Sequence, residues 1–136
     1  MNKITIHNAN AHSAQEVFDF AAGHLLIQGK RSVNSKGDPA YRGLGGLKCP
    51  IGAIVPDEDY SQILENKEFA GTEWARLCGH HAPLLWALQS IHDNKDADVW
   101  GFHLGLHAEM NGLTYFPEKI RKDYRALMGL PDPAEK

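Results

Sequence analysis

The stretch that decides the fold is SAQEVFDFAAGHLLIQG, residues 13–29. It opens with a capping box, in which the Ser13 hydroxyl can accept a hydrogen bond from the Glu16 amide while the Glu16 carboxylate reaches back. Apolar residues then recur at helical spacing on one face, at Val17, Phe18, Ala21 and Leu25. Because Gly29 is a favourable helix stop, the stretch predicts a helix that ends at about residue 28.

The segments around this helix predict a mixed fold. Residues 3–7 alternate apolar and polar side chains, which is typical of a short strand. Two further strands, at 41–42 and 47–55, are expected on either side of the glycine-rich connection 43–46. Helices are expected over 56–65, 83–92, 97–112 and 117–128, with a weaker helical turn over 73–78. We therefore expect an α+β domain that is mainly helical, with four to five helices packed around a small β-hairpin or short antiparallel sheet.

Length and composition predict one domain over residues 1–130, followed by a flexible tail over 131–136. The chain has 136 residues, of which 43% are apolar and 23% charged, as in ordinary globular domains. It has neither an apolar signal region at its N-terminus nor a run long enough to span a membrane. Its only cysteines are Cys49 and Cys78. These features predict a cytoplasmic protein with both thiols reduced.

Charge is unevenly distributed, although the formal net charge is only -3. Residues 28–52 contain five basic residues and one acidic residue, whereas residues 53–115 contain three basic and ten acidic residues. Such a division can steer a charged partner toward one face, or it can simply reflect solvated surfaces. The basic segment is too small for the stripe expected of a nucleic-acid binder, so we expect no direct binding to nucleic acid.

Two histidines could suggest a zinc site. His103 and His107 stand four residues apart, a spacing that suits two ligands on one helix face. Four other side chains could complete a tetrahedral set: Cys78, His80, His81 and Glu109. However, Leu104 occupies the position where a zincin motif requires glutamate, and both histidines fall within an apolar arc. Packing is the favoured interpretation, and we expect no cofactor or metal.

A thiol-dependent site is the second chemical alternative. Cys49 could act as a nucleophile, with His92 or His24 as the base and Asp93 as the orienting group. An activated cysteine usually lies at a helix N-terminus or beside a cation, whereas Cys49 falls in a predicted strand before Pro50. We therefore expect a core residue. An enzyme that uses metal or thiol chemistry remains the rival functional class.

Four segments carry a family resemblance: LLIQGKRS at 25–32, YRG at 41–43, GLKCPIGAIVPDEDY at 46–60 and LQSIHD at 88–93. Together they resemble a family of small uncharacterised proteins from phages and bacterial genomes, over about residues 14–113. The family pattern usually has a small residue where Pro50 stands, so the local backbone can differ there. The resemblance implies no activity. It implies a genomic setting in which small proteins bind a host enzyme or block a defence complex.

We therefore expect a phage- or prophage-type binding protein that acts non-catalytically on a host protein, for example as an inhibitor of an enzyme or defence complex. Arginine and tyrosine are favoured interface anchors, which points to the basic loop and hairpin as the contact region. The residues expected there are Lys30, Arg31, Tyr41, Arg42 and Lys48. We expect a monomer or a small homo-oligomer. If Arg31 or Arg42 were buried against an acidic residue, a purely structural role would gain support.

Overall fold

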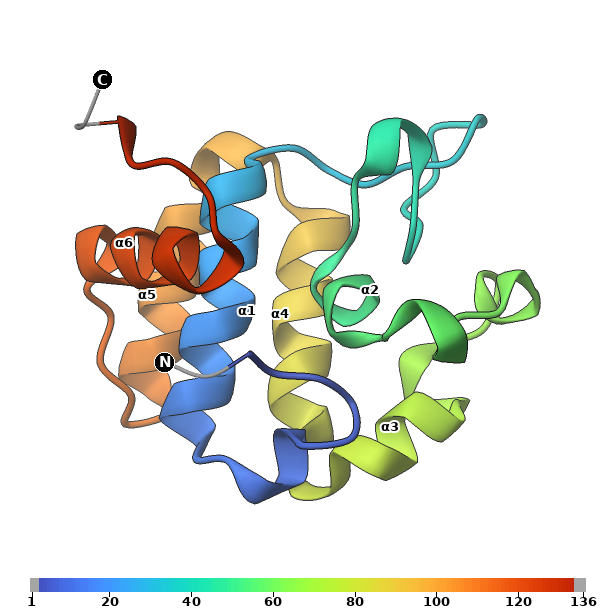
Figure 1. The fold of residues 1–136 in the computed structure, drawn as a ribbon, viewed down its shortest axis with the longest axis horizontal. Helices are drawn as coiled ribbons and strands as arrows, with labels where there is room; N and C mark the ends of the chain where they lie inside the picture. Colours follow the sequence, from blue (N-terminus) through green and yellow to red (C-terminus); the bar gives the residue numbers. More distant parts are fainter. Residues whose placement is uncertain (1–2, 134–136) are drawn as a thin grey trace.

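The computed structural model describes residues 3–133, and its framework is the helix α1, Ala14–Gln28 (Figure 1). The predicted capping box is confirmed, because Ser13 Oγ accepts from the Glu16 amide and the Glu16 carboxylate accepts from the Ser13 amide. Gly29 ends the helix with a φ of 63°, a left-handed conformation that favours glycine. The sequence thus predicted both ends of α1 correctly.

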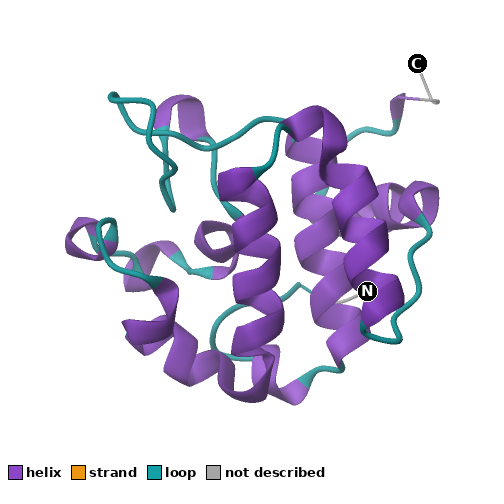
Figure 2. Cartoon of the chain, turned by 180° about the vertical axis from the view of Figure 1, so that it is seen from behind, coloured by secondary structure: helices purple, strands orange, loops and turns teal. Residues whose placement is uncertain are grey.

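Three further helices pack around α1: α4 (Ala82–Asn94), α5 (Trp100–Met110) and α6 (Pro117–Met128). They confirm the helices expected from residues 83, 97 and 117, although 97–99 form a 3-10 turn. Figures 1 and 2 show α4 and α5 running alongside α1 while α6 crosses it. The largest fully buried side chains are Trp100, Phe18, Phe20, Ile4, Ile6, Leu25, Ile51, Ile54, Leu85, Leu88, Leu104 and His92.

The crossing of α6 over α1 depends on the small residue Gly23. A Cβ atom at this position would lie 2.8 Å from the Cβ of Tyr124 on α6. Because real Cβ atoms do not approach other carbons so closely, glycine lets Tyr124 pack directly on the α1 backbone. The Tyr124 ring also contacts Phe20 at a centroid distance of 5.3 Å.

The expected α+β class is wrong, because residues 3–133 form a helical structure without a sheet. Only two isolated β-bridges occur among them, Val33 with Pro39 and Arg42 with Lys48. The expected N-terminal strand is irregular backbone whose Ile6 amide donates to the Ile54 carbonyl at 2.9 Å. In place of the second hairpin strand, the chain forms the short helix α2, Pro50–Ile54.

The local chemistry around Pro50 explains why a helix replaces the expected strand. Cys49 caps α2, since its Sγ accepts from the Gly52 amide at 3.2 Å. Pro50 follows at the first helical position, where a missing N–H costs nothing because that amide has no intrahelical partner. A Cβ at Gly52 would lie 1.8 Å from the Tyr41 carbonyl oxygen, so only glycine allows the preceding segment to pack against α2.

The remaining segments are short helices and turns. The helix expected over 56–65 is replaced by two 3-10 turns, Asp57–Asp59 and Gln62–Leu64. Residues 73–78 form α3 as expected, with the Thr72 hydroxyl accepting from the Ala75 amide. Within residues 3–133, none of the helices has both the length and the apolar character needed to cross a bilayer. Part of the expected tail, residues 134–136, lies outside the described residues.

Candidate functional site

Arg31, one of the expected contact residues, is bonded to the end of α4. Its Nε donates to the His92 carbonyl at 3.0 Å and its Nη2 donates to the Lys95 carbonyl at 2.6 Å. These carbonyls belong to the last turn of the helix and the residue after it, where acceptors lack intrahelical partners and a positive charge is favourable. The guanidinium therefore caps the helix and holds the 29–33 segment against it.

Arg42 is also bonded within the molecule. Its Nη1 contacts Asp57 Oδ1 at 2.7 Å and its Nη2 donates to the Val55 carbonyl at 2.5 Å. The guanidinium lies 4.5 Å from the centroid of the Tyr60 ring, a distance typical of a cation–π contact. Only 19% of the Arg42 side chain is exposed. This pairing with an acidic residue supports the structural interpretation of Arg42.

The other three expected contact residues do not form one cationic surface. Tyr41 is buried, and its hydroxyl donates to the Lys67 carbonyl at 2.7 Å. Burial raises the pKa of Tyr41 well above its usual range, so it stays neutral. Lys48 is half-buried and contributes its backbone to bonds with α1, whereas Lys30 is exposed. The structure thus places these side chains against different segments and exposes only part of the set.

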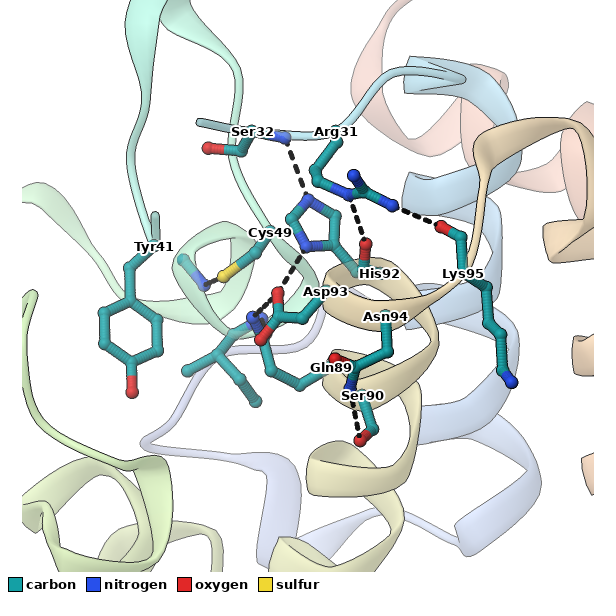
Figure 3. A network of polar contacts seen from close by, with 12 residues as sticks. Arg31, Ser32, Tyr41, Cys49, Gln89, Ser90, His92, Asp93, Asn94 and Lys95 are labelled. Atoms are coloured by element: carbon teal, nitrogen blue, oxygen red, sulfur yellow. Dashed lines mark hydrogen bonds and ion pairs between the residues drawn. The ribbon is translucent and has the colours of Figure 1, made fainter. Parts of the chain in front are cut away.

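Figure 3 shows a buried polar network that connects α4 with the 31–52 segment. His92 is fully buried, and its Nε2 accepts from the Ser32 amide at 2.9 Å. Its Nδ1 lies 2.7 Å from Asp93 Oδ1, to which it donates because Nε2 is already the acceptor. Gln89 extends the network, donating to the same Asp93 oxygen and accepting from the Ile51 amide. The sequence suggested His92 only as a possible base for Cys49, and did not predict that it links α4 to the 31–52 segment.

The geometry around Cys49 does not support thiol catalysis. Its side chain is fully buried and caps α2, and burial raises the pKa of the thiol to about 12. The thiol therefore stays protonated at neutral pH. The nitrogen of His92 that could accept its proton is already bonded to the Ser32 amide. Cys78 is likewise buried, and its pKa is raised by burial to about 11.

Two of the histidines considered as metal ligands, His107 and His81, make contacts within the molecule. The His107 ring stacks on Phe18 with a centroid distance of 6.1 Å, and burial lowers its pKa. His81 Nε2 donates to the His12 carbonyl at 2.6 Å. Across residues 3–133, no three histidine, cysteine or acidic side chains are grouped closely enough to share a metal ion.

Two hollows border Trp86 on the surface of the molecule. Trp86 lies on α4 with 53% of its surface exposed. On one side is a cavity of about 300 Å³, whose lining includes Glu65, Glu68 and Asp93 together with Lys67. On the other side is a groove of about 760 Å³, lined mainly by apolar residues together with Glu73 and Arg76, and Phe69 lines both hollows. We call Trp86 with these two hollows the Trp86 surface.

A sequence signal for this surface exists, although Trp86 was not among the expected contact residues. Within the helix expected over 83–92, the predicted apolar face is formed by Leu84, Leu88 and Ile91. At 100° per residue, Trp86 falls on the opposite side of the helix from Leu84. A large aromatic residue outside the core face is a candidate interface anchor. The acidic residues around it come from separate turns, which only the fold brings together.

No protein-family model, curated protein or solved structure matches this chain. The candidate site therefore rests on its own residues and geometry.

Proposed function

We propose that this chain is a phage- or prophage-type binding protein that acts non-catalytically in the host cytoplasm by occupying the surface of a host protein. The observation that carries the proposal is the exposed Trp86, which lies between an acidic cavity and an apolar groove. Tryptophan is the residue type most enriched among the few side chains that dominate binding energy. The family resemblance of the four sequence segments supports the phage setting.

The chemistry of the Trp86 surface defines the kind of segment it would bind. Glu68 is exposed and Asp93 is half-buried at the cavity, so both can attract a positive charge. Phe69 and Pro83 bound the groove on the other side of Trp86. A partner segment with an arginine or lysine beside an apolar side chain would match both hollows. The partner is thus expected to be basic at this contact, which agrees with the excess of acidic residues over 53–115.

The internal roles of the polar residues support a binding function over the rival enzyme. Arg31 and Arg42 are bonded to backbone carbonyls, and Cys49 is fully buried. These two guanidinium groups and this thiol therefore hold loops against α4 and α2. The accessible groups at the Trp86 surface include the indole of Trp86, the carboxylate of Glu68 and the cations of Lys67 and Arg76, which are suited to recognition.

Affinity capture from a bacterial lysate tests the proposal when four baits are compared. The wild-type chain is expected to retain a host protein in stoichiometric amount. Trp86→Ala and Glu68→Lys are each expected to weaken that retention at least about tenfold, the size of a hot-spot loss. The matched control is the double variant Lys30→Glu/Lys36→Glu, which changes exposed charges on the basic loop and is expected to retain the partner.

Tryptophan fluorescence provides a direct second measurement with the purified partner. Trp74 and Trp100 are 2% and 1% exposed, so a blue shift on titration would report mainly on Trp86. If the Lys30→Glu/Lys36→Glu variant lost the partner while Trp86→Ala retained it fully, the contact would lie on the basic loop instead. Failure of the wild-type chain to retain any stoichiometric protein would refute the binding function itself.

A further inference from the structure

Asn111 and Gly112 form the only Asn-Gly pair in the sequence, and they lie in the turn that follows α5. Asparagine is one of the chemically labile residue types, and a following glycine has no Cβ to shield its backbone nitrogen. Both residues are exposed, and a Cβ at Gly112 would have open space within 4 Å. The turn is therefore a candidate site of deamidation, in which that nitrogen attacks the side-chain amide of the asparagine.

The backbone bonds that close this turn are unequal in length. Gly112 has a φ of 68°, and the Leu113 amide donates to the Ala108 carbonyl at 2.8 Å, as in a Schellman motif. The Gly112 amide, in contrast, lies 3.4 Å from the Glu109 carbonyl, longer than an ordinary N–H···O bond. The nitrogen that must lose its proton during deamidation is thus only weakly held.

The conformation of Asn111 in the closed turn slows the reaction. Its ψ is 14°, so the Gly112 nitrogen is nearly eclipsed with the Asn111 nitrogen. Ring closure requires the Gly112 nitrogen to be eclipsed with the Asn111 Cβ instead. In addition, Asn111 Nδ2 donates to the His107 carbonyl at 2.8 Å. Deamidation therefore depends on local opening of the turn, which does not require the whole domain to unfold.

Gln15 of α1 restrains that opening. Its Oε1 accepts from the Thr114 amide at 2.8 Å, and its Nε2 donates to the Thr114 carbonyl at 3.0 Å. The same Nε2 donates to Asp19 Oδ1 at 2.8 Å, which fixes the orientation of the amide group. We call the two bonds between Gln15 and Thr114 the Gln15 clasp. It fastens the chain to α1 two residues after Gly112 and so limits rotation within the turn.

Asn34 provides a reference within the same chain, because the small residue Ser35 follows it in an exposed loop. Its Oδ1 accepts from the Lys36 amide at 2.9 Å and from the Asp38 amide at 3.1 Å. The side-chain amide is thus held by two backbone groups, and Ser35 has a Cβ beside the attacking nitrogen. Asn34 is therefore expected to react more slowly than Asn111.

We propose that Asn111 is a site of spontaneous deamidation whose rate is set by the Gln15 clasp. The Gly112 nitrogen forms a bond to Asn111 Cγ, the Cγ–Nδ2 bond breaks, and ammonia leaves with the proton of the Gly112 amide. Water then opens the resulting succinimide at either carbonyl carbon, adding its hydroxyl there and returning a hydrogen to the Gly112 nitrogen. The products are aspartate and isoaspartate, and water is the only co-reactant. This inference does not depend on the proposed binding function.

The modification changes the end of α5. The His107 carbonyl loses the Nδ2 donor, and a negative charge appears at the C-terminal end of the helix, where the helix dipole disfavours it. Isoaspartate also lengthens the backbone of the turn by one carbon atom. The deamidated chain is therefore expected to melt at a lower temperature than the unmodified chain.

Peptide mapping by mass spectrometry, after incubation of the folded chain at pH 8, tests the site. Aspartate and isoaspartate are expected at Asn111 before any product appears at Asn34. The reaction is expected to be slower at pH 6, because the Gly112 nitrogen must lose its proton. Gln15→Ala is expected to accelerate the reaction about tenfold, since each lost hydrogen bond shifts the opening equilibrium by a factor of roughly two to ten.

Arg42→Met is the matched control, because it removes hydrogen bonds to Asp57 and Val55 in another segment. It is expected to deamidate at Asn111 at the wild-type rate, which would show that the clasp acts locally and not through overall stability. Equal rates in the wild type and Gln15→Ala, or the same acceleration in Arg42→Met, would overturn the role of the clasp. Product formed at Asn34 ahead of Asn111 would overturn the site itself.

Discussion

The segment 29–56 and the outer faces of α4 and α5 use their side chains in opposite ways. The first carries Arg31, Arg42 and Cys49, which bond to backbone groups within the molecule. The second carries Trp86 and Phe102, which are 53% and 69% exposed. In the first region, arginine and cysteine side chains make bonds within the molecule. In the second, large aromatic side chains that are usually buried in a core are exposed to solvent.

This difference teaches that a long irregular segment needs polar side chains for its own folding. Residues 29–49 have little regular secondary structure, so many of their backbone groups must bond to side chains or water. Ser32, Tyr41 and Arg42 each have amides bonded to side chains of other segments. The helices α4 and α5 satisfy their own backbones, which leaves their outer faces available for partners.

The comparison is tested most strongly at Gly52, where the irregular segment packs against α2. In Gly52→Ala the new Cβ would lie 1.8 Å from the Tyr41 carbonyl oxygen, so the backbone must shift. We expect a loss of about 4 kcal/mol or more in the free energy of unfolding, above the usual range for overpacking because the clash is with backbone. Urea denaturation followed by circular dichroism measures this loss.

The matched control is Gly71→Ala, since a Cβ there has open space within 4 Å. Its free energy of unfolding is expected to stay within about 1 kcal/mol of the wild type. Equal stability of the two alanine variants would show that the contact between Tyr41 and α2 does not hold the irregular segment in place.

The next largest loss in the free energy of unfolding is expected at low pH, and its cause is His24. Its Nε2 donates to the Lys48 carbonyl at 2.7 Å, and burial lowers its pKa from 6.5 to about 4. Below pH 6.5 the His24 imidazole therefore binds a proton in the unfolded chain, whereas in the folded chain it stays neutral down to about pH 4. Stability is fully present above that pH and falls by roughly 1.4 kcal/mol per pH unit toward pH 4, roughly 3 kcal/mol in total.

Chemical denaturation of wild type and His24→Gln at pH 7 and pH 4 isolates this contribution. The variant lacks the titrating imidazole, so its stability should fall less over that range even if it starts from a lower value. Parallel losses in the two proteins would mean that the contact between α1 and the Lys48 loop tolerates a charge.

The parts of the fold that sequence predicted are those with local signals. The α1 boundaries followed from a capping box and a glycine stop, and both are written in adjacent residues. Helices α4 and α6 likewise begin at a proline in the first turn. These signals work because they depend on only a few neighbouring backbone groups.

The error at 47–55 arose because the deciding contacts are distant in sequence. Apolar residues there fit a strand as well as a short buried helix. The Ile51 amide bonds to Gln89 on α4, and Gly52 packs under Tyr41. The internal bonds of Arg31 and Arg42 could not be predicted for the same reason, because the carbonyls that accept from them belong to other segments of the chain. The Trp86 surface could have been noted from the helical wheel, but its acidic side could not.

The smallest effect is expected at Arg42, and it sharpens the comparison between internal and external charges. Arg42→Met keeps an apolar stem over Tyr60 but removes the bonds to Asp57 and the Val55 carbonyl. We expect a loss of about 1 to 2 kcal/mol in the free energy of unfolding, because the carbonyl loses a charged donor and the ring loses its cation.

Lys30→Met is the matched control, since Lys30 is an exposed cation in the same loop. Its free energy of unfolding should change by no more than about 0.5 kcal/mol. If both variants lost the same small amount, Arg42 would contribute no more than a solvated surface charge. The inward and outward cations of this loop would then be equivalent for folding, and Arg42 would again be a candidate for contact with a partner. A loss confined to Arg42→Met would instead assign its guanidinium to folding.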